Sequence, residues 1–229
     1  MRTRSMRLWL AAALTSTLAV ASPAQAEIIT FESVAPSLFV QGETFAQGGY
    51  ALTVNGDYGV VDTVDSCYIV SCPTGNDTAF YYGVNDGHLL LTRKGDLFDL
   101  QGFDAAFLAP YAQPAGVDAG QIRISALDAN GTRINAGFDF AISDDFGFAF
   151  TTYSGSDFSA FRNIVSVEFL ACTYDSFGLC LNVNQNLSQF TLDNLQVVPE
   201  PGSVALMGLG LAGLLFAGRR QRARTSSQA

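Results

Sequence analysis

The chain has 229 residues, a formal net charge of −9 and a hydrophobic content of 48%. Seven of its twelve Lys and Arg lie in the first seven or the last eleven residues, which leaves residues 27–198 with five Lys and Arg against twenty Asp and Glu, a formal charge of −15. So acidic a region repels nucleic acid and anionic lipid, and this excludes nucleic-acid binding as its function.

Residues 1–26 have the features of a secretory signal peptide. Three arginines precede an apolar stretch from Leu8 to Ala21, and Ala24-Gln25-Ala26 has the small-x-small pattern of a cleavage site. We therefore predict cleavage between Ala26 and Glu27; an uncleaved N-terminal anchor is the alternative. Cleavage would leave residues 27–198 as an exported region whose length suits a single domain.

The sequence of this domain predicts β-structure almost throughout. It is rich in Phe, Tyr, Val, Ile and Thr, and Gly, Asn and Asp separate its short apolar runs. No stretch of a dozen residues keeps an apolar stripe at helical spacing. About ten strands in one exported domain predict an all-β fold, a two-sheet sandwich. The predicted strands are 28–31, 50–54, 59–64, 79–83, 88–92, 103–108, 121–127, 133–140, 146–152, 164–173 and 189–197.

The register of one hairpin can be predicted from the alternation of its apolar residues. Apolar residues alternate in 121–127 and again in 133–140, around an Asn130-Gly131 pair. A two-residue turn at that pair would place the two apolar sets on opposite faces. A three-residue loop with Gly131 in the left-handed conformation pairs Ala126 with Ile134 and aligns both sets, so we predict the longer loop.

Four cysteines, Cys67, Cys72, Cys172 and Cys180, lie in the exported region, where an oxidising compartment favours disulfides. Three pairings are possible, and we favour Cys67 with Cys72 and Cys172 with Cys180, because each pair brackets a short stretch with turn residues. A metal site is the alternative, but neither pair has Cys-x-x-Cys spacing and His88 is near neither in sequence.

The sequence gives little support to catalysis. His88 is the only histidine, so Ser-His or Cys-His acyl transfer is not favoured. Two function classes remain open. The first is a non-catalytic surface or matrix protein that binds polysaccharide through tyrosines, although these could equally be strand residues at the sandwich rim. The second is a secreted carbohydrate-active hydrolase that uses paired Asp and Glu. The candidate tyrosines are Tyr58, Tyr81, Tyr82, Tyr111 and Tyr153.

The last predicted strand has a break in its alternation. Phe190 and Leu192 share one parity, whereas Leu195 and Val197 share the other. A bulge or bend at Asp193-Asn194 would bring both pairs to the core side.

Residues 199–229 form a distinct C-terminal segment. Pro199-Glu200-Pro201 precedes a charge-free apolar run from Val204 to Ala217, and four arginines follow that run. The run is short for a transmembrane helix, but its flanks and the positive-inside bias favour one whose arginines stay cytoplasmic. A C-terminal core helix is the alternative, although the run has no polar face to expose. The prolines hold the segment before the helix extended.

The order of these pieces resembles the PEP-CTERM sorting signal of exported bacterial proteins. The resemblance implies recognition of Pro199, Glu200 and Pro201 by an exosortase-type protease-transpeptidase, which would cut near them. It also implies an intermediate anchored in the inner membrane by the C-terminal helix, followed by release to the cell surface or the extracellular matrix.

The stretch 189–195 also resembles the Phe-x-x-Asp-Asn closing strand that is common just ahead of such signals. With the opening strand at 29–32 and the segment 98–104, it resembles a jelly roll of the carbohydrate-binding-module type. First and last strands commonly lie close together in such folds, and the predicted bulge would re-aim a side chain. We therefore hypothesise one structural calcium ion with Glu32 and Asp193 as ligands, although two side chains supply only part of the six to eight oxygens that calcium takes. The alternative is that Asp193 caps the bulge and Glu32 faces solvent.

Overall fold

The computed structural model describes residues 25–66, 71–181 and 187–200. Their regular structure is β apart from two short 3-10 turns, η1 at Val64–Ser66 and η2 at Gly155–Phe158. The strands are β1 Glu27–Ile29, β2 Ser37–Val40, β3 Thr44–Gln47, β4 Tyr50–Asn55, β5 Tyr58–Asp62, β6 Phe80–Val84, β7 His88–Thr92, β8 Phe98–Phe107, β9 Gly120–Asp128, β10 Arg133–Asp139, β11 Thr151–Ser154, β12 Ile164–Tyr174, β13 Cys180–Leu181 and β14 Phe190–Pro199.

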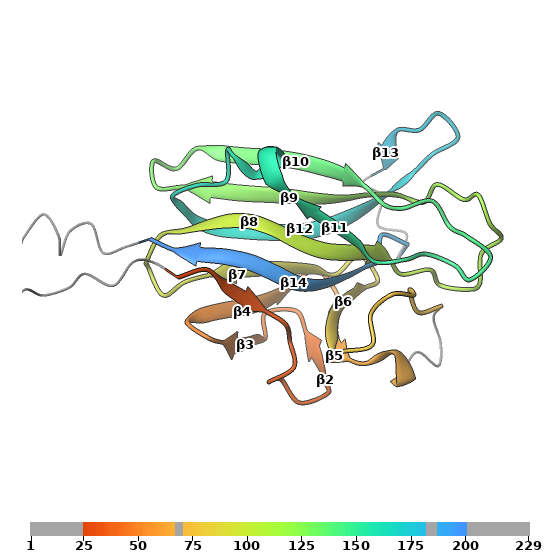
Figure 1. The fold of residues 1–229 in the computed structure, drawn as a ribbon, viewed down its shortest axis with the longest axis horizontal. Helices are drawn as coiled ribbons and strands as arrows, with labels where there is room; N and C mark the ends of the chain where they lie inside the picture. Colours follow the sequence, from red (N-terminus) through yellow and green to blue (C-terminus); the bar gives the residue numbers. More distant parts are fainter. Residues whose placement is uncertain (1–24, 67–70, 182–186, 201–229) are drawn as a thin grey trace, which may run out of the picture. The chain divides into compact units, whose positions relative to one another are not determined.

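The strands form two packed layers, which confirms the predicted all-β sandwich (Figure 1). Sheet one has the order β2-β5-β6-β14-β8-β11, and β1 pairs with the second half of β14. Sheet two has the order β3-β4-β7-β12-β9-β10, with β13 beside the end of β12. The sheets are linked at one corner, where Phe98 of β8 pairs with Ile164 of β12.

Aromatic rings fill the space between the sheets. Phe103 of sheet one lies 5.4 Å, centroid to centroid, from Phe169 of sheet two, with the rings nearly perpendicular. The Phe103 ring also contacts Phe138, Tyr153 and Phe158 at 5.3–5.7 Å. Edge-to-face pairs of this kind add to the free energy of area burial. The core therefore joins the two sheets through specific ring contacts as well as through aliphatic packing.

The β9–β10 hairpin has the predicted register. Ala126 pairs with Ile134, and the Asp128 N–H donates to the Thr132 carbonyl at 2.9 Å, so residues 129–131 form a three-residue loop. Gly131 has φ +80°, the left-handed conformation that this loop needs. The Asn-Gly pair thus closes the longer loop.

The last strand has the predicted bulge. The register of β14 against β8 shifts between Asp193 and Gln196, and Asn194 has φ +49°. Leu192, Leu195 and Val197 are all fully buried. A left-handed non-glycine residue costs about 1–2 kcal/mol, whereas each large apolar side chain that becomes buried contributes about 1.5–3 kcal/mol. Burial of residues on both sides of the bulge therefore outweighs its cost.

Several predicted strand limits were wrong. The strands β2 and β3 were not expected; both lie at sheet edges, where Phe39 and Phe45 stack at 4.6 Å but neighbouring side chains stay exposed. The strand predicted at 103–108 begins five residues earlier, at Phe98. The strand predicted at 146–152 is mostly loop, and only Thr151–Ser154 pairs with β8.

Two predicted targeting elements lie outside the described residues. These are the signal peptide up to residue 24 and the C-terminal helix. Within the ranges given above, no helix is long and apolar enough to cross a membrane. The strand β1 begins at Glu27, the first residue after the predicted cleavage bond.

Candidate functional site

The predicted processing motif begins inside the folded domain. Pro199 is the last residue of β14 and lies opposite Phe98 of β8, so the strand runs two residues beyond the predicted end at Val197. The pairing continues to the next residue, because the Glu200 N–H donates to the Leu97 carbonyl at 3.1 Å. Pro201 lies outside the described residues.

The side chain of Glu200 rests against the domain. Its Oε1 atom is shielded from solvent and has no hydrogen-bond partner among the residues that the structure describes. Burial raises the pKa of this carboxyl group, and the negative charge of Asp99 raises it further. The central residue of the motif is therefore in a less favourable environment for its charge than a fully solvated glutamate.

A polar pocket of about 360 Å³ lies next to this strand end. Its walls come from β8, from the segment that leaves β11 through η2, and from β14. Asp99 is held in place because its Oδ1 accepts the Asn163 N–H at 2.9 Å. The lining residues are Asp99, Leu100, Gln101, Ser154, Gly155, Ser156, Phe158, Ser159, Arg162 and Gln196.

This pocket offers chemistry suited to sugar hydroxyls. Gln101 and Gln196 carry both donors and acceptors, and serine hydroxyls do the same on a shorter side chain. Arg162 is exposed and has no ion-pair partner within the described part of the chain, although Asp99 lines the same pocket. The pocket could not be predicted from the sequence, because its walls come from three segments that are far apart in the chain and share no motif.

The five candidate tyrosines do not form one surface. Tyr81 and Tyr82 are buried in β6, and Tyr153 of β11 donates to the Asp139 carbonyl at 2.7 Å. Tyr58, at the start of β5, and Tyr111, in the loop after β8, are exposed, at 36% and 68% respectively. Of the five, only Tyr58 and Tyr111 are therefore accessible to a polysaccharide without rearrangement, Tyr111 the more so.

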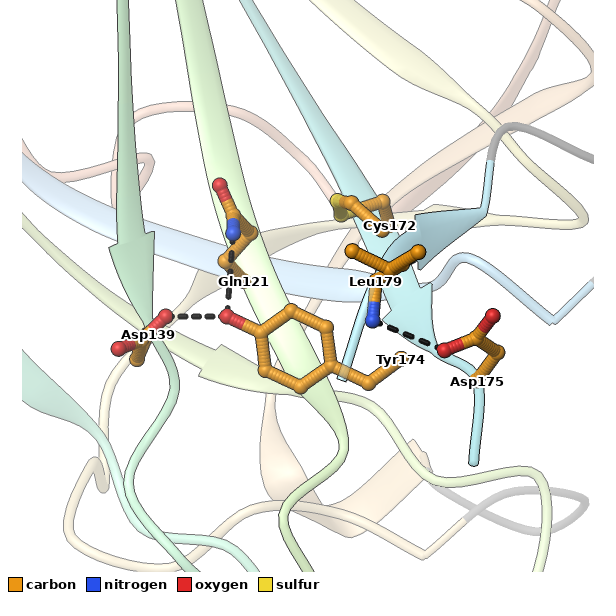
Figure 2. The surroundings of a disulfide bond; sticks show 7 residues. Gln121, Asp139, Cys172, Tyr174, Asp175 and Leu179 are labelled. Atoms are coloured by element: carbon orange, nitrogen blue, oxygen red, sulfur yellow. Dashed lines mark hydrogen bonds between the residues drawn. A yellow bond between two sulfur atoms is a disulfide. The ribbon is translucent and has the colours of Figure 1, made fainter. Parts of the chain in front are cut away.

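One predicted cysteine pair is present as a disulfide. Cys172 of β12 is bonded to Cys180 of β13, and so ties the 174–181 hairpin to the end of sheet two. Cys67 lies outside the described residues, so its pairing with Cys72 stays a prediction. Near the bonded pair, the Gln121 side-chain amide donates to the Tyr174 hydroxyl at 3.0 Å, and that hydroxyl donates to Asp139 (Figure 2).

His88 lies at the start of β7, on the outer face of sheet two. Its Nδ1 is 3.4 Å from Oε1 of Glu168, and the Asn55 amide donates to the same oxygen at 3.0 Å. These contacts lower the pKa of Glu168, the histidine hydrogen bond more than any other cause. The histidine therefore forms a polar contact between strands, as a structural residue would.

Sheet one has a pair of neighbouring carboxylates, the residue type that a glycoside hydrolase uses. Asp193 of β14 pairs with Asp104 of β8, and the Asn194 amide donates to Asp104 at 2.7 Å. Asp193, however, is fully buried beneath the loop that contains Asn76 and Thr78. A polysaccharide cannot reach that carboxyl group in this arrangement.

The buried Asp193 carboxylate accepts three hydrogen bonds. Its Oδ2 accepts from the Asn76 amide at 2.7 Å and from the Thr78 hydroxyl at 3.3 Å, and its Oδ1 accepts from the Asn194 N–H at 2.7 Å. These bonds lower its pKa, but loss of solvent outweighs them and raises the pKa to about 6. Asp193 is therefore a buried acid whose charge is stabilised only in part.

The predicted calcium ligands fit an ion only in part. As predicted, the first and last strands are neighbours, with Ile29 opposite Leu195. Glu32 is exposed in the turn after β1, whereas the oxygens of Asp193 already accept bonds from donors that an ion would have to displace. Within the described ranges no group of three or more His, Cys, Asp or Glu could hold a metal. The calcium site stays a prediction.

Comparisons with known proteins identify one sequence motif. Residues 197–221 match the family described as the PEP-CTERM protein-sorting motif, so the chain carries this motif. The match begins at Val197, inside β14. No curated protein matches the chain.

Some solved structures are similar to the chain at low identity. A carbohydrate-binding module of family 29 is 13% identical, with coverage of 77% of this chain and 88% of that one and a TM-score of 0.29. The CBM22-1 xylan-binding domain of Paenibacillus barcinonensis Xyn10C is 12% identical, with coverage of 77% and 96% and a TM-score of 0.32.

The raised pKa of Asp193 predicts an unusual pH dependence of stability. The folded-state pKa, about 6, lies above the ordinary value of 3.8. The contribution of Asp193 is therefore fully present below pH 3.8 and is lost as the pH rises through 6. Relative to Asp193→Asn, the wild type should lose about 2–3 kcal/mol of unfolding free energy between pH 4 and pH 7. Urea unfolding across this range measures the difference. The control is Asp77→Asn, an exposed position in the same loop; parallel curves for wild type and Asp193→Asn would contradict the prediction.

The calcium prediction is tested by thermal unfolding with calcium and with chelator. An ion bound only by the folded state stabilises it by about 2.7 kcal/mol at one hundred times its dissociation constant. The midpoint of the wild type should rise with calcium, and that of Asp193→Asn and Glu32→Gln should rise less. An unchanged wild-type midpoint across millimolar calcium would remove the site.

Proposed function

We propose that this chain is an exported, non-catalytic cell-surface or matrix protein that an exosortase-type enzyme processes at Pro199, Glu200 and Pro201. The single observation that carries the proposal is the sorting motif at residues 197–221, which starts within the last strand of the domain. Before processing, the C-terminal apolar segment would hold the chain in the inner membrane. After processing, the domain would be released to the surface or to the surrounding polysaccharide.

The position of β14 suits this sequence of events. The strand is paired as far as Pro199, and one further backbone hydrogen bond follows at Glu200. A cut on the C-terminal side of Glu200 would leave every strand of both sheets complete. A cut before Val197 would remove residues that are buried and paired with β1 and β8. The fold therefore favours cleavage at or after the motif.

We also propose that the released domain binds polysaccharide in the pocket beside β14. Ligand sites are usually concave and contain a few well-placed polar groups. The pocket combines side-chain amides, hydroxyls and Arg162 with the apolar surface of Leu100 and Phe158. The alternative, a hydrolase with paired carboxylates, has less support, because the Asp193–Asp104 pair is closed to substrate.

Processing predicts a defined change in mass. Protein isolated from the native cell surface should lack Val204 to Ala229, and intact-mass spectrometry measures the loss directly. Replacement of both prolines, Pro199→Ala with Pro201→Ala, should leave the tail in place and the protein in the membrane fraction. Tyr111→Ala, a change far from the motif in sequence, serves as the matched control. A full tail on mature wild-type surface protein would refute processing.

Polysaccharide binding in this pocket is tested with variants of the full chain, whose binding is measured on an array of neutral glycans. Gln101→Leu and Arg162→Met keep side-chain volume but remove polar groups, so each should weaken binding about tenfold. Tyr111→Ala should bind like the wild type. If Tyr111→Ala alone abolishes binding, the site is the exposed loop after β8 instead. If the bound glycans are shortened during incubation, the hydrolase alternative replaces the binding proposal.

A further inference from the structure

The outer face of sheet two carries polar side chains at regular intervals. In β9, Ile122, Ile124 and Ala126 are buried toward the core, and the residues between them alternate to the outside. Arg123 and Ser125 are therefore on the outer face, opposite Leu170 and Glu168 of β12. On the other edge of β9, Arg123 lies opposite Gly137 of β10, a residue over which the Gln121 side chain lies.

Two arginines of this face line the same groove. Arg133 begins β10, and its Nη1 donates to the Ser125 hydroxyl at 2.7 Å, which brings its guanidinium back along the sheet toward Arg123. Arg123 has no hydrogen-bond or ion-pair partner within the described residues. Both arginines line one groove of about 250 Å³, together with Ser125, Asn135, Glu168 and Leu170.

The charge balance makes this arrangement unusual. The domain has twenty carboxylates and only five Lys and Arg, so an arginine without a carboxylate partner is not explained by a shortage of acids. The acid that lines the groove, Glu168, already contacts His88 and Asn55 through Oε1. Arg133 also lowers the pKa of Glu168 from a distance, without forming an ion pair with it. The groove therefore holds two guanidinium groups against one carboxylate, in a domain that is otherwise strongly acidic.

We propose that this groove binds the carboxylate group of an acidic sugar residue in a polysaccharide. The planar fork of a guanidinium matches a carboxylate through two parallel hydrogen bonds. Arg123 is available for such a pair, and Arg133 supplies the second positive charge. Asn135 and Glu168 offer a donor and an acceptor for ring hydroxyls, and Leu170 supplies an apolar surface for the ring.

This inference extends the proposed polysaccharide binding and names a ligand class for a second site. The pocket beside β14 is formed by sheet one and η2, whereas the groove is formed by β9, β10 and β12 of sheet two. A singly charged group suits the groove better than a doubly charged phosphate, because Glu168 and the acidic domain repel the second negative charge. Long-range attraction of a polyanion is not expected, so recognition depends on contacts inside the groove.

The test measures binding of the full chain, in detergent, to an oligomer of galacturonic acid. At about 0.15 M salt the screening length is about 8 Å, so remote carboxylates are largely screened while contacts in the groove persist. Wild type should bind the oligomer but not its methyl ester, which lacks the charge. Arg123→Gln and Arg133→Gln should each weaken binding about tenfold or more. Lys94→Gln removes one positive charge elsewhere on the domain and should bind like the wild type.

Each other outcome overturns the proposal. These outcomes are no binding of galacturonate, equal binding of its methyl ester, an equal loss in Lys94→Gln, and tighter binding of dextran sulfate than of galacturonate. Unfolding midpoints of the two arginine variants, expected to equal that of the wild type because both side chains are on the outer face, exclude misfolding as the cause of a loss. If galacturonate does not bind while neutral glycans do, and Arg162→Met weakens the neutral-glycan binding, the first site stands and the second fails.

Discussion

The bulge at Asp193–Asn194 is the local feature on which sheet one depends. β14 pairs with β8 along one edge and with β6 and β1 along the other. Its apolar side chains must therefore pack into the core along the whole strand. A regular strand would turn Leu195 and Val197 outward. The bulge returns both to the core and places Asp193 on the covered outer side, where Asn76 and Thr78 hold its carboxylate. One irregularity thus determines the packing of the central strand and the environment of the most deeply buried acid.

The features that could be predicted from the sequence are those that a short stretch determines by itself. The β9–β10 register follows from two alternating segments and the loop that joins them. The bulge follows from a change of parity within eight residues, because only an extra residue can bury both sets. The sorting motif was recognised for the same reason, since its parts are contiguous.

The remaining features depend on contacts between distant segments. Tyrosines such as Tyr81 and Tyr82 are residues that the sequence would place at the rim of the sandwich. Both are buried, because the loop before β6 and the facing sheet cover them. The strands β2 and β3 have little apolar alternation to signal them and are held by their neighbours β5 and β4. The polar pocket and the arginine groove each combine side chains from three or more strands or loops. Such sites form where strands that are distant in sequence pair in a particular register. That register cannot be predicted from any one short stretch of the sequence.

The place of β14 in the sheet also affects how the domain assembles during synthesis. Chains are made from the N-terminus, so β6 and β8 exist well before the strand that lies between them. Until residues 190–199 are added, sheet one lacks its middle strand, and the backbone edges of β6 and β8 that pair with β14 have no partner. The residues that complete the sheet adjoin the sorting motif directly. A chain that ends before residue 190 therefore lacks both the central strand of sheet one and the sorting motif, so truncation removes part of the fold and the sorting signal together.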